Sequence, residues 1–303
     1  MRHDSSITLR DRFQGCLLGL ATGDAIGTTL EFADRGSFSP IKEMIGGGPF
    51  NLEVGQWTDD TSMALCLAHS LISNNGFDAG DQMNRYCNWW QWGYMSSTGE
   101  CFDIGVTVSR ALKRYLNSNE PYSGSIDATS AGNGSLMRLA PVPMFFYDNL
   151  EDTVRYAGES SRTTHATAEC IDSCRYFSSL IYAAFKGLSK NKILNFNGCQ
   201  PETKNVAEIS KGRYKEKTAS EIRGSGYVIE SMEAALWSFY TTDSYESAVL
   251  KAANLGDDAD TTAAIAGQVA GAYYGIEGIP QRWLGKLYQA KDIEDLADAL
   301  CRF

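Results

Sequence analysis

The segment from Thr8 to Ile26 places a glycine at every fourth position, Gly15, Gly19 and Gly23, among apolar residues at helical spacing. Residues four apart share one face of a helix. The segment therefore predicts a helix with a face of small residues, against which another helix can pack closely. The alternation of apolar and polar residues that is typical of half-buried strands occurs almost nowhere in the chain. Together these patterns predict an all-α fold.

A chain of 303 residues is long enough to bury a large core, and we expect a single domain over residues 1–303. Its hydrophobic content of 43% and charged content of 21% are ordinary for a globular protein. The formal net charge of −10 argues against a surface that neutralises a phosphate backbone. We therefore expect no nucleic acid polymer as a partner.

Apolar runs in the sequence are too short to span a bilayer. The first eleven residues contain no apolar segment typical of a secretory leader, and the run from about Ala263 to Ile276 is interrupted by Gln268. The eight cysteines are scattered and suggest free buried thiols rather than a disulfide framework or a zinc site. We expect a cytoplasmic protein that does not bind membranes.

The most acidic motif stands directly before a helix-like run of small residues. Asp258 and Asp260 lie two apart and Thr261 follows, so three oxygen-bearing side chains can converge beside a helix start. Carboxylates this close repel one another unless a cation lies between them, and an all-oxygen set favours Mg²⁺, Mn²⁺ or Ca²⁺ over zinc. The alternative is an ordinary N-cap, since Asp and Thr both cap helices well.

A second cluster repeats this chemistry far away in the sequence. Thr58, Asp59 and Asp60 again stand immediately before an apolar run. Two such helix starts facing each other would hold two cations between them. The repetition therefore favours a dinuclear metal site over two unrelated caps.

Two more carboxylates are candidates for the reaction itself. Glu31 emerges from an apolar, glycine-rich stretch, and its alternative is a solvated residue in a loop. Asp103 precedes a helix predicted to reach about Asn117, so it is either an N-cap or an active acid.

A glycine-rich stretch around Asn133 predicts a turn into a further helix, where backbone N–H groups can hold phosphate. His165 lies at the predicted entrance of a long helix that ends near Gly187. A lone histidine in such a place is more often structural than a ligand. The segment 189–223 is polar and rich in lysine, and we expect it to be a peripheral solvated insertion.

Taken together, the motifs resemble those of the ADP-ribosylglycohydrolase family, and among its members the bacterial dinitrogenase-reductase-activating branch. The matching motifs run in one order along the chain: Gly23 to Glu31, Trp57 to Thr61, Cys101 to Gly105, Gly132 to Arg138, Thr164 and His165, Gly224 to Tyr227, and Gly256 to Thr261.

The resemblance implies an orthogonal multi-helix bundle with a dinuclear Mg²⁺ or Mn²⁺ site at one face. By motif it assigns the metal-ligand roles to Thr58, Asp59, Asp60, Asp258, Asp260 and Thr261. It assigns catalysis to Asp103, Glu31 and Asp59. It assigns substrate contacts to Asp59, Asp103, Gly132, Asn133, Gly134, Ser135, His165 and Tyr227.

The implied activity is metal-dependent removal of ADP-ribose from mono-ADP-ribosylated protein, with free ADP-ribose as product. Arginine is the expected linkage, because a carboxylate such as Asp103 can pair with a guanidinium. Three alternatives stay open: hydrolysis of O-linked ADP-ribose on serine or in O-acetyl-ADP-ribose, an ADP-ribose-binding module without turnover, and a crystallin-like structural protein. The acidic clusters argue against the last, because unneutralised buried carboxylates are costly.

Overall fold

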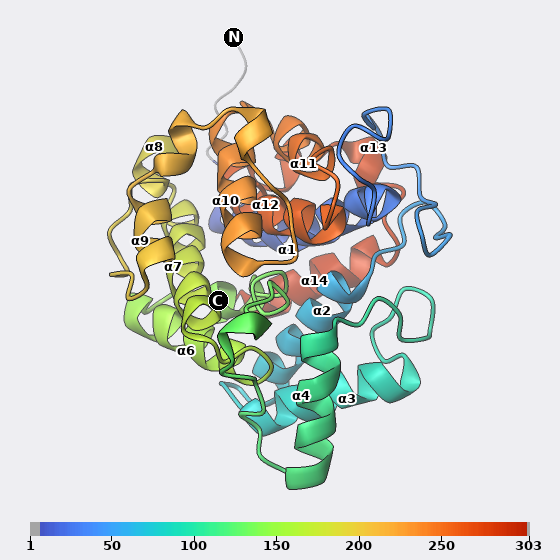
Figure 1. Ribbon diagram of the computed structural model, residues 1–303, viewed down its shortest axis with the longest axis vertical. Coiled ribbons are helices and arrows are strands. Elements are labelled where there is room, and N and C mark those ends of the chain that lie inside the picture. Colours follow the sequence, from blue (N-terminus) through green and yellow to red (C-terminus); the bar gives the residue numbers. More distant parts are fainter. Residues whose placement is uncertain (1–6, 302–303) are drawn as a thin grey trace.

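Helices α1 (Leu9–Gly27) and α12 (Ala259–Tyr274) pack against each other along their whole length at the buried centre of the molecule (Figure 1). A methyl group placed on Gly19 would lie 2.4 Å from the carbonyl oxygen of Gly267, and one on Gly15 would lie 2.4 Å from that of Gly271. Such distances exclude any side chain. The glycine face predicted from the sequence is thus what allows the two helices to touch backbone to backbone.

The computed structural model describes residues 7–301, and within them regular structure is entirely helical, as predicted. The remaining α-helices are α2 (Asp59–Ser73), α3 (Ala79–Trp92), α4 (Val106–Ser118), α5 (Pro141–Phe145), α6 (Leu150–Arg162), α7 (Ala168–Phe185), α8 (Lys190–Ile193), α9 (Lys204–Ser210), α10 (Val228–Tyr240), α11 (Tyr245–Ala253), α13 (Gln281–Leu284) and α14 (Ala290–Leu300). In the same residues no helix combines the length and apolar character needed to cross a membrane. All eight cysteines are free.

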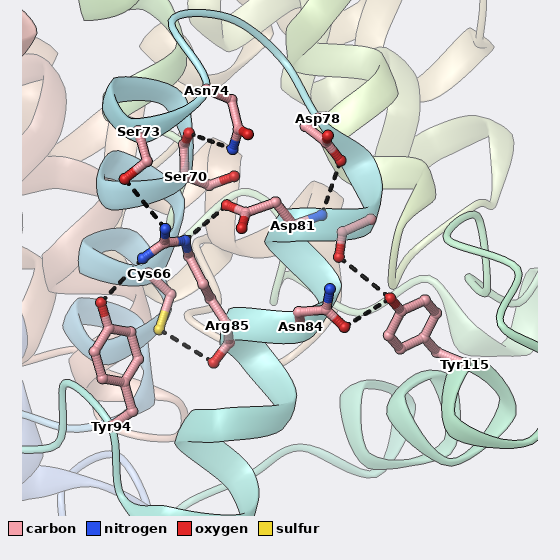
Figure 2. A network of polar contacts seen from close by, with 11 residues as sticks. Cys66, Ser70, Ser73, Asn74, Asp78, Asp81, Asn84, Arg85, Tyr94 and Tyr115 are labelled. Carbon is pink, nitrogen blue, oxygen red and sulfur yellow. Dashed lines mark hydrogen bonds and ion pairs between the residues drawn. The ribbon is translucent and has the colours of Figure 1, made fainter.

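Helices α2, α3 and α4 are held together by a polar network (Figure 2). The Arg85 guanidinium on α3 donates to Asp81 at 2.7 Å, to the Tyr94 hydroxyl at 3.1 Å and to Ser73 on α2 at 3.2 Å. Tyr94 stands at the start of the loop between α3 and α4. The network therefore anchors the first part of the loop that carries Asp103.

Helix α7 begins later than the sequence predicts. Thr167 is its N-cap and accepts from the backbone N–H of Cys170, so the helix starts at Ala168 rather than near Ser161. The preceding helix α6 ends at Arg162, and His165 lies in the connection between the two helices. The histidine is thus held on a tight connection and not on a helix.

The segment 189–223 lies at the edge of the molecule, with α8 and α9 beside α7 (Figure 1). It is nevertheless not simply solvated as expected, because Ile193, Val206, Tyr214 and Ile222 are fully buried. These apolar residues stand singly among many lysines, so the composition of the segment does not reveal that they are buried.

Candidate metal centre and active site

Asp24, in the last turns of α1, receives four hydrogen bonds from the start of α2. One oxygen accepts from the backbone N–H and the hydroxyl of Thr58, both at 2.9 Å, and the other accepts from those of Thr61 at 3.0 and 2.6 Å. Burial nevertheless raises the pKa of Asp24 to about 6. Sequence reasoning did not assign a role to Asp24, although a lone carboxylate in a glycine-rich apolar helix is a signal.

The two predicted acidic clusters come together at the N-termini of α2 and α12. Carboxylate oxygens of Asp24, Asp60 and Asp260 lie within 4.8 Å of one another, and those of Glu31, Asp258 and Asp260 do the same. The Thr58 hydroxyl lies 3.1 Å from an oxygen of Asp60 and 3.3 Å from one of Asp260. Asp260 therefore belongs to both groups of carboxylates.

These carboxylates are buried without a cationic side chain. Asp60 is fully buried and Asp260 is 1% exposed, and none of the ion pairs within residues 7–301 involves either. Burial, reinforced by the neighbouring carboxylates, raises the pKa of Asp59 and of Asp60 well above the ordinary range and that of Asp260 to about 7. A bound cation would remove this cost.

One buried oxygen points directly to a missing partner. Oδ1 of Asp60 is inaccessible to solvent and forms no hydrogen bond in the part of the chain that the structure describes. Buried polar atoms are almost always satisfied. An orphaned carboxylate oxygen within a set of oxygen donors fits a hard divalent cation, so the acidic cluster could hold a metal.

A cavity of about 350 Å³ opens in front of the carboxylates. The predicted site residues that line it are Glu31, Asp59, Asp103, Gly132, Asn133, Gly134, His165, Asp258, Asp260 and Thr261. Thr58 and Asp60 are fully buried and do not line it. The cavity thus joins predicted site residues from six separate parts of the chain.

Glu31 is not the solvated loop residue of the alternative interpretation, since its exposure is only 6%. Its Oε2 accepts from the backbone N–H of Ala259 at 2.8 Å and from that of Asp260 at 3.4 Å. A carboxylate here complements the N-terminus of α12. Burial and the neighbouring Asp260 raise the pKa of Glu31 strongly. The side chain therefore caps α12 and at the same time lines the cavity.

Asp103 does not cap α4. The N-cap of that helix is Gly105, and no side chain caps the helix. Asp103 instead lies in the left-handed backbone region, with φ of 56°, and lines the cavity. Burial, together with Asp59 and Asp260, raises its pKa to about 11. Aspartate is among the residues that adopt this region most readily, so the turn at Asp103 costs little.

The sequence predicts that the turn around Asn133 leads directly into a helix, and this is wrong. The next helix, α5, begins only at Pro141. Asn133 donates from its side-chain amide to Asp258 at 2.9 Å. His165 packs against the turn so closely that a methyl group on Gly134 would lie 2.8 Å from its Cε1 atom. Backbone groups of this turn, rather than the N-terminus of a helix, therefore line the cavity.

His165 is held as a neutral ring. Burial, with the nearby Arg138, lowers its pKa to about 3. Its Nδ1 lies 2.9 Å from the Thr164 hydroxyl, which accepts from the buried Arg138 guanidinium at 2.8 Å. With the guanidinium donating to Thr164, the Thr164 hydroxyl hydrogen is available to Nδ1, and this arrangement places the ring hydrogen on Nε2.

Two predicted substrate contacts lie outside the cavity lining. Ser135 is 2% exposed and accepts from the Ser161 hydroxyl at 2.8 Å. The Tyr227 hydroxyl donates to Glu169 at 2.6 Å, while the backbone of Tyr227 pairs with that of Gly132 beside the cavity. Both roles stay predictions.

The comparisons with known proteins agree with this geometry. The model of the family described as ADP-ribosylglycohydrolase matches residues 5–302. The chain belongs to the ADP-ribosylglycohydrolase family. This confirms the family resemblance and the predicted fold and indicates a hydrolase rather than a structural protein.

Individual ADP-ribosylglycohydrolases are similar to this one over nearly its whole length. ADP-ribosylarginine hydrolase Tri1 of Serratia proteamaculans (strain 568) is 44% identical, covering 96% of this chain and 79% of that protein. ADP-ribosyl-[dinitrogen reductase] glycohydrolase of Rhodospirillum rubrum is 30% identical, and the match covers 97% of this chain and 96% of that protein. A solved structure described as an ADP-ribosylglycohydrolase-related protein complex matches with a TM-score of 0.85 and 40% identity. The match covers 97% of this chain and 98% of that one.

Proposed function

We propose that this ADP-ribosylglycohydrolase removes ADP-ribose from arginine side chains of mono-ADP-ribosylated protein and releases free ADP-ribose. The observation that carries the proposal is the cavity in which Asp59, Asp103 and Asp260 face the glycine-rich turn at Asn133. Two relatives that are named ADP-ribosylarginine hydrolase, at 44% and 41% identity, support the arginine linkage. The excess of carboxylates suits a cationic leaving group.

The ligands that would hold two divalent cations, Mg²⁺ or Mn²⁺, are Thr58, Asp59, Asp60, Asp258, Asp260 and Thr261. Bound cations would supply Lewis-acid chemistry, favouring deprotonation of water and holding the ribose hydroxyls. The orphaned oxygen of Asp60 and the shared position of Asp260 support this assignment. Asp24 would not be a ligand of choice, since four hydrogen bonds already occupy its oxygens.

The remaining cavity residues would orient ADP-ribose. Backbone groups of Gly132, Asn133 and Gly134 and the Nε2 hydrogen of His165 would contact the diphosphate and the ribose. Neutral His165 donates one hydrogen without adding a charge. Tyr227 would contact the adenine ring only in a position that its hydrogen bond to Glu169 allows.

Asp103 is the better candidate for the proton transfer. Glu31 already accepts two backbone N–H groups, whereas Asp103 lines the cavity without capping a helix. Water adds to the anomeric carbon as the C–N bond breaks, through an oxocarbenium-like transition state. With cations bound nearby, the ionised carboxylate of Asp103 would take up the proton that the added water loses. It would then pass this proton to the departing neutral guanidine, which leaves as guanidinium.

The proposal is tested with a protein that carries ADP-ribose on a single arginine. The purified chain should release ADP-ribose from it, lose this activity after treatment with a chelator, and regain it when Mg²⁺ or Mn²⁺ is added back. Comparing the two cations at equal concentration identifies the preferred metal. Absence of release with either cation would contradict the proposed function.

A further inference from the structure

Three phenylalanines form a continuous row at the acidic side of the cavity. The ring centroids of Phe32 and Phe50 are 6.2 Å apart, and those of Phe50 and Phe102 are 5.3 Å apart. Phe32 is 67% exposed, whereas Phe50 and Phe102 are half-buried. We call Phe32, Phe50 and Phe102 the aromatic strip. The exposure of Phe32, at the edge of the cavity that it also lines, leaves its ring accessible to a ligand.

The strip is adjacent in the chain to two of the three carboxylates that are candidates for catalysis. Phe32 directly follows Glu31, and Phe102 directly precedes Asp103. Phe32 also lines the cavity itself, together with these two carboxylates. Because Phe50 contacts both other rings, the strip connects the loops that carry Glu31 and Asp103.

The backbone of Phe32 is held in an unfavourable conformation. Its φ of 60° lies in the left-handed region, which a bulky side chain rarely adopts. Two hydrogen bonds to the loop before α12 hold it there: the Phe32 N–H donates to the Asp257 carbonyl at 2.8 Å, and the Asp257 N–H donates to the Ala33 carbonyl at 2.9 Å. A glycine would relieve the strain, so an aromatic residue here calls for a reason other than folding.

An exposed aromatic ring beside carboxylates suits a planar cation. Guanidinium groups stack on aromatic faces and pair with carboxylates at their edges. None of the cation–π contacts within residues 7–301 involves a ring of the strip. The strip is therefore not occupied by an arginine or lysine of the described chain.

We infer that the aromatic strip is the recognition surface for the leaving group, with the ring of Phe32 stacked on the guanidinium of the modified arginine. This inference rests on the proposed function, because the group that leaves must stand next to the carboxylates that act on the broken bond. Phe50 contacts the Phe32 ring in an edge arrangement and is itself in contact with Phe102. Phe32 is thus a specificity-determining residue for arginine and not a contact for ADP-ribose.

The test measures two properties of the Phe32→Ala, Phe32→Leu and Phe32→Tyr variants with Mg²⁺ present. The first is kcat/KM for release of ADP-ribose from an arginine-modified peptide, and the second is Kd for free ADP-ribose by calorimetry. Trp92→Ala is the matched control, because Trp92 is 77% exposed and lies at the end of α3, outside the cavity lining.

We expect kcat/KM to fall by about tenfold in Phe32→Ala and Phe32→Leu, which corresponds to the loss of one cation–π contact. Phe32→Tyr should retain the wild-type value, Trp92→Ala should change nothing, and Kd for ADP-ribose should stay constant throughout. Unchanged kcat/KM in Phe32→Ala overturns the inference, and so does an equal weakening of ADP-ribose binding. A wild-type chain that releases nothing from arginine overturns the proposed function as well, which separates the two failures.

Discussion

A methyl group placed on Gly27 would lie 2.4 Å from the Cα atom of Asp260, so the last turn of α1 touches the first turn of α12 through their backbones. The same approach brings carboxylate oxygens of Asp24 and Asp260, one from each helix, within 4.8 Å of each other. The glycine face of α1 therefore does more than pack the core. It sets the spacing of the acidic site.

Replacing Gly27 with alanine should damage both the fold and the site. The added methyl group meets backbone atoms that cannot move independently, so we expect the free energy of unfolding to fall by about 2 kcal/mol or more. Urea denaturation measures this loss. Gly76→Ala is the control, since the nearest atom to its added methyl group is 3.9 Å away. Equal stability of Gly27→Ala and wild type would contradict the packing argument.

Replacing Asp260 with asparagine should remove metal binding. Asp260 contributes to both carboxylate groups, so loss of its charge affects each of them. Titration calorimetry with Mn²⁺ should show fewer bound ions in Asp260→Asn than in wild type. Asp257→Asn is the matched control, because Asp257 is exposed and belongs to neither group. The same stoichiometry in all three proteins would refute the assignment of the ligands.

The metal-free protein should lose stability as the pH rises. Folding raises the pKa of Asp24 to about 6 and that of Asp260 to about 7, so the folded state binds protons more tightly than the unfolded state. The stability that these two protonated side chains contribute is fully present below about pH 4, the ordinary pKa of aspartate. It is lost as the pH rises through 6 and 7. Thermal unfolding in chelator between pH 4.5 and 7.5 measures this trend.

Added Mg²⁺ or Mn²⁺ should act in the opposite direction, since a cation competes with the proton for Asp260 and its charge disfavours protonation of the neighbouring Asp24. The increase in melting temperature on adding the cation should therefore grow from pH 5 to pH 7.5. In Asp260→Asn the melting temperature measured in chelator should fall less steeply with pH than in wild type. The prediction fails if the metal-free protein becomes more stable between pH 4.5 and 7.5 and Asp260→Asn shows the same dependence on pH. Asp24 and Asp260 would then not bind protons more tightly in the folded state.

Replacing Asp103 with asparagine should reduce turnover without harming the fold. Asparagine tolerates the positive φ of this position, and the change removes a carboxylate whose pKa burial raises to about 11. We expect kcat to fall by about 10²-fold or more, as for loss of a general acid or base. The melting temperature should be unchanged or higher. Wild-type kcat in this variant would exclude Asp103 from the chemistry.

Much of the site could be predicted from local patterns. Repeated Thr and Asp residues at two helix starts predicted that distant segments would meet, and the structure brings Asp60 and Asp260 together. The glycine spacing of α1 predicted a close helix partner, which is α12. Both predictions depend on chemistry that is visible within a few residues of sequence.

What the sequence could not show depends on orientation between distant elements. Nothing near Asp24 in the chain reveals that it faces the start of α2, so its four hydrogen bonds were missed. The side chain of Tyr227 reaches Glu169 on α7, a contact that only the tertiary fold creates. Likewise, Phe50 could not be placed between Phe32 and Phe102 before the loops were seen together.

The central claim is that the acidic cavity cleaves ADP-ribose from arginine, and a direct comparison of two linkages tests it. Two peptides of otherwise identical sequence, one carrying ADP-ribose on arginine and one on serine, are incubated with the protein at matched concentration and with the same metal. We predict fast release from arginine and slow release from serine, because only the arginine leaving group offers a cation to Asp103 and its neighbours. Equal or faster release from the serine peptide would contradict the account.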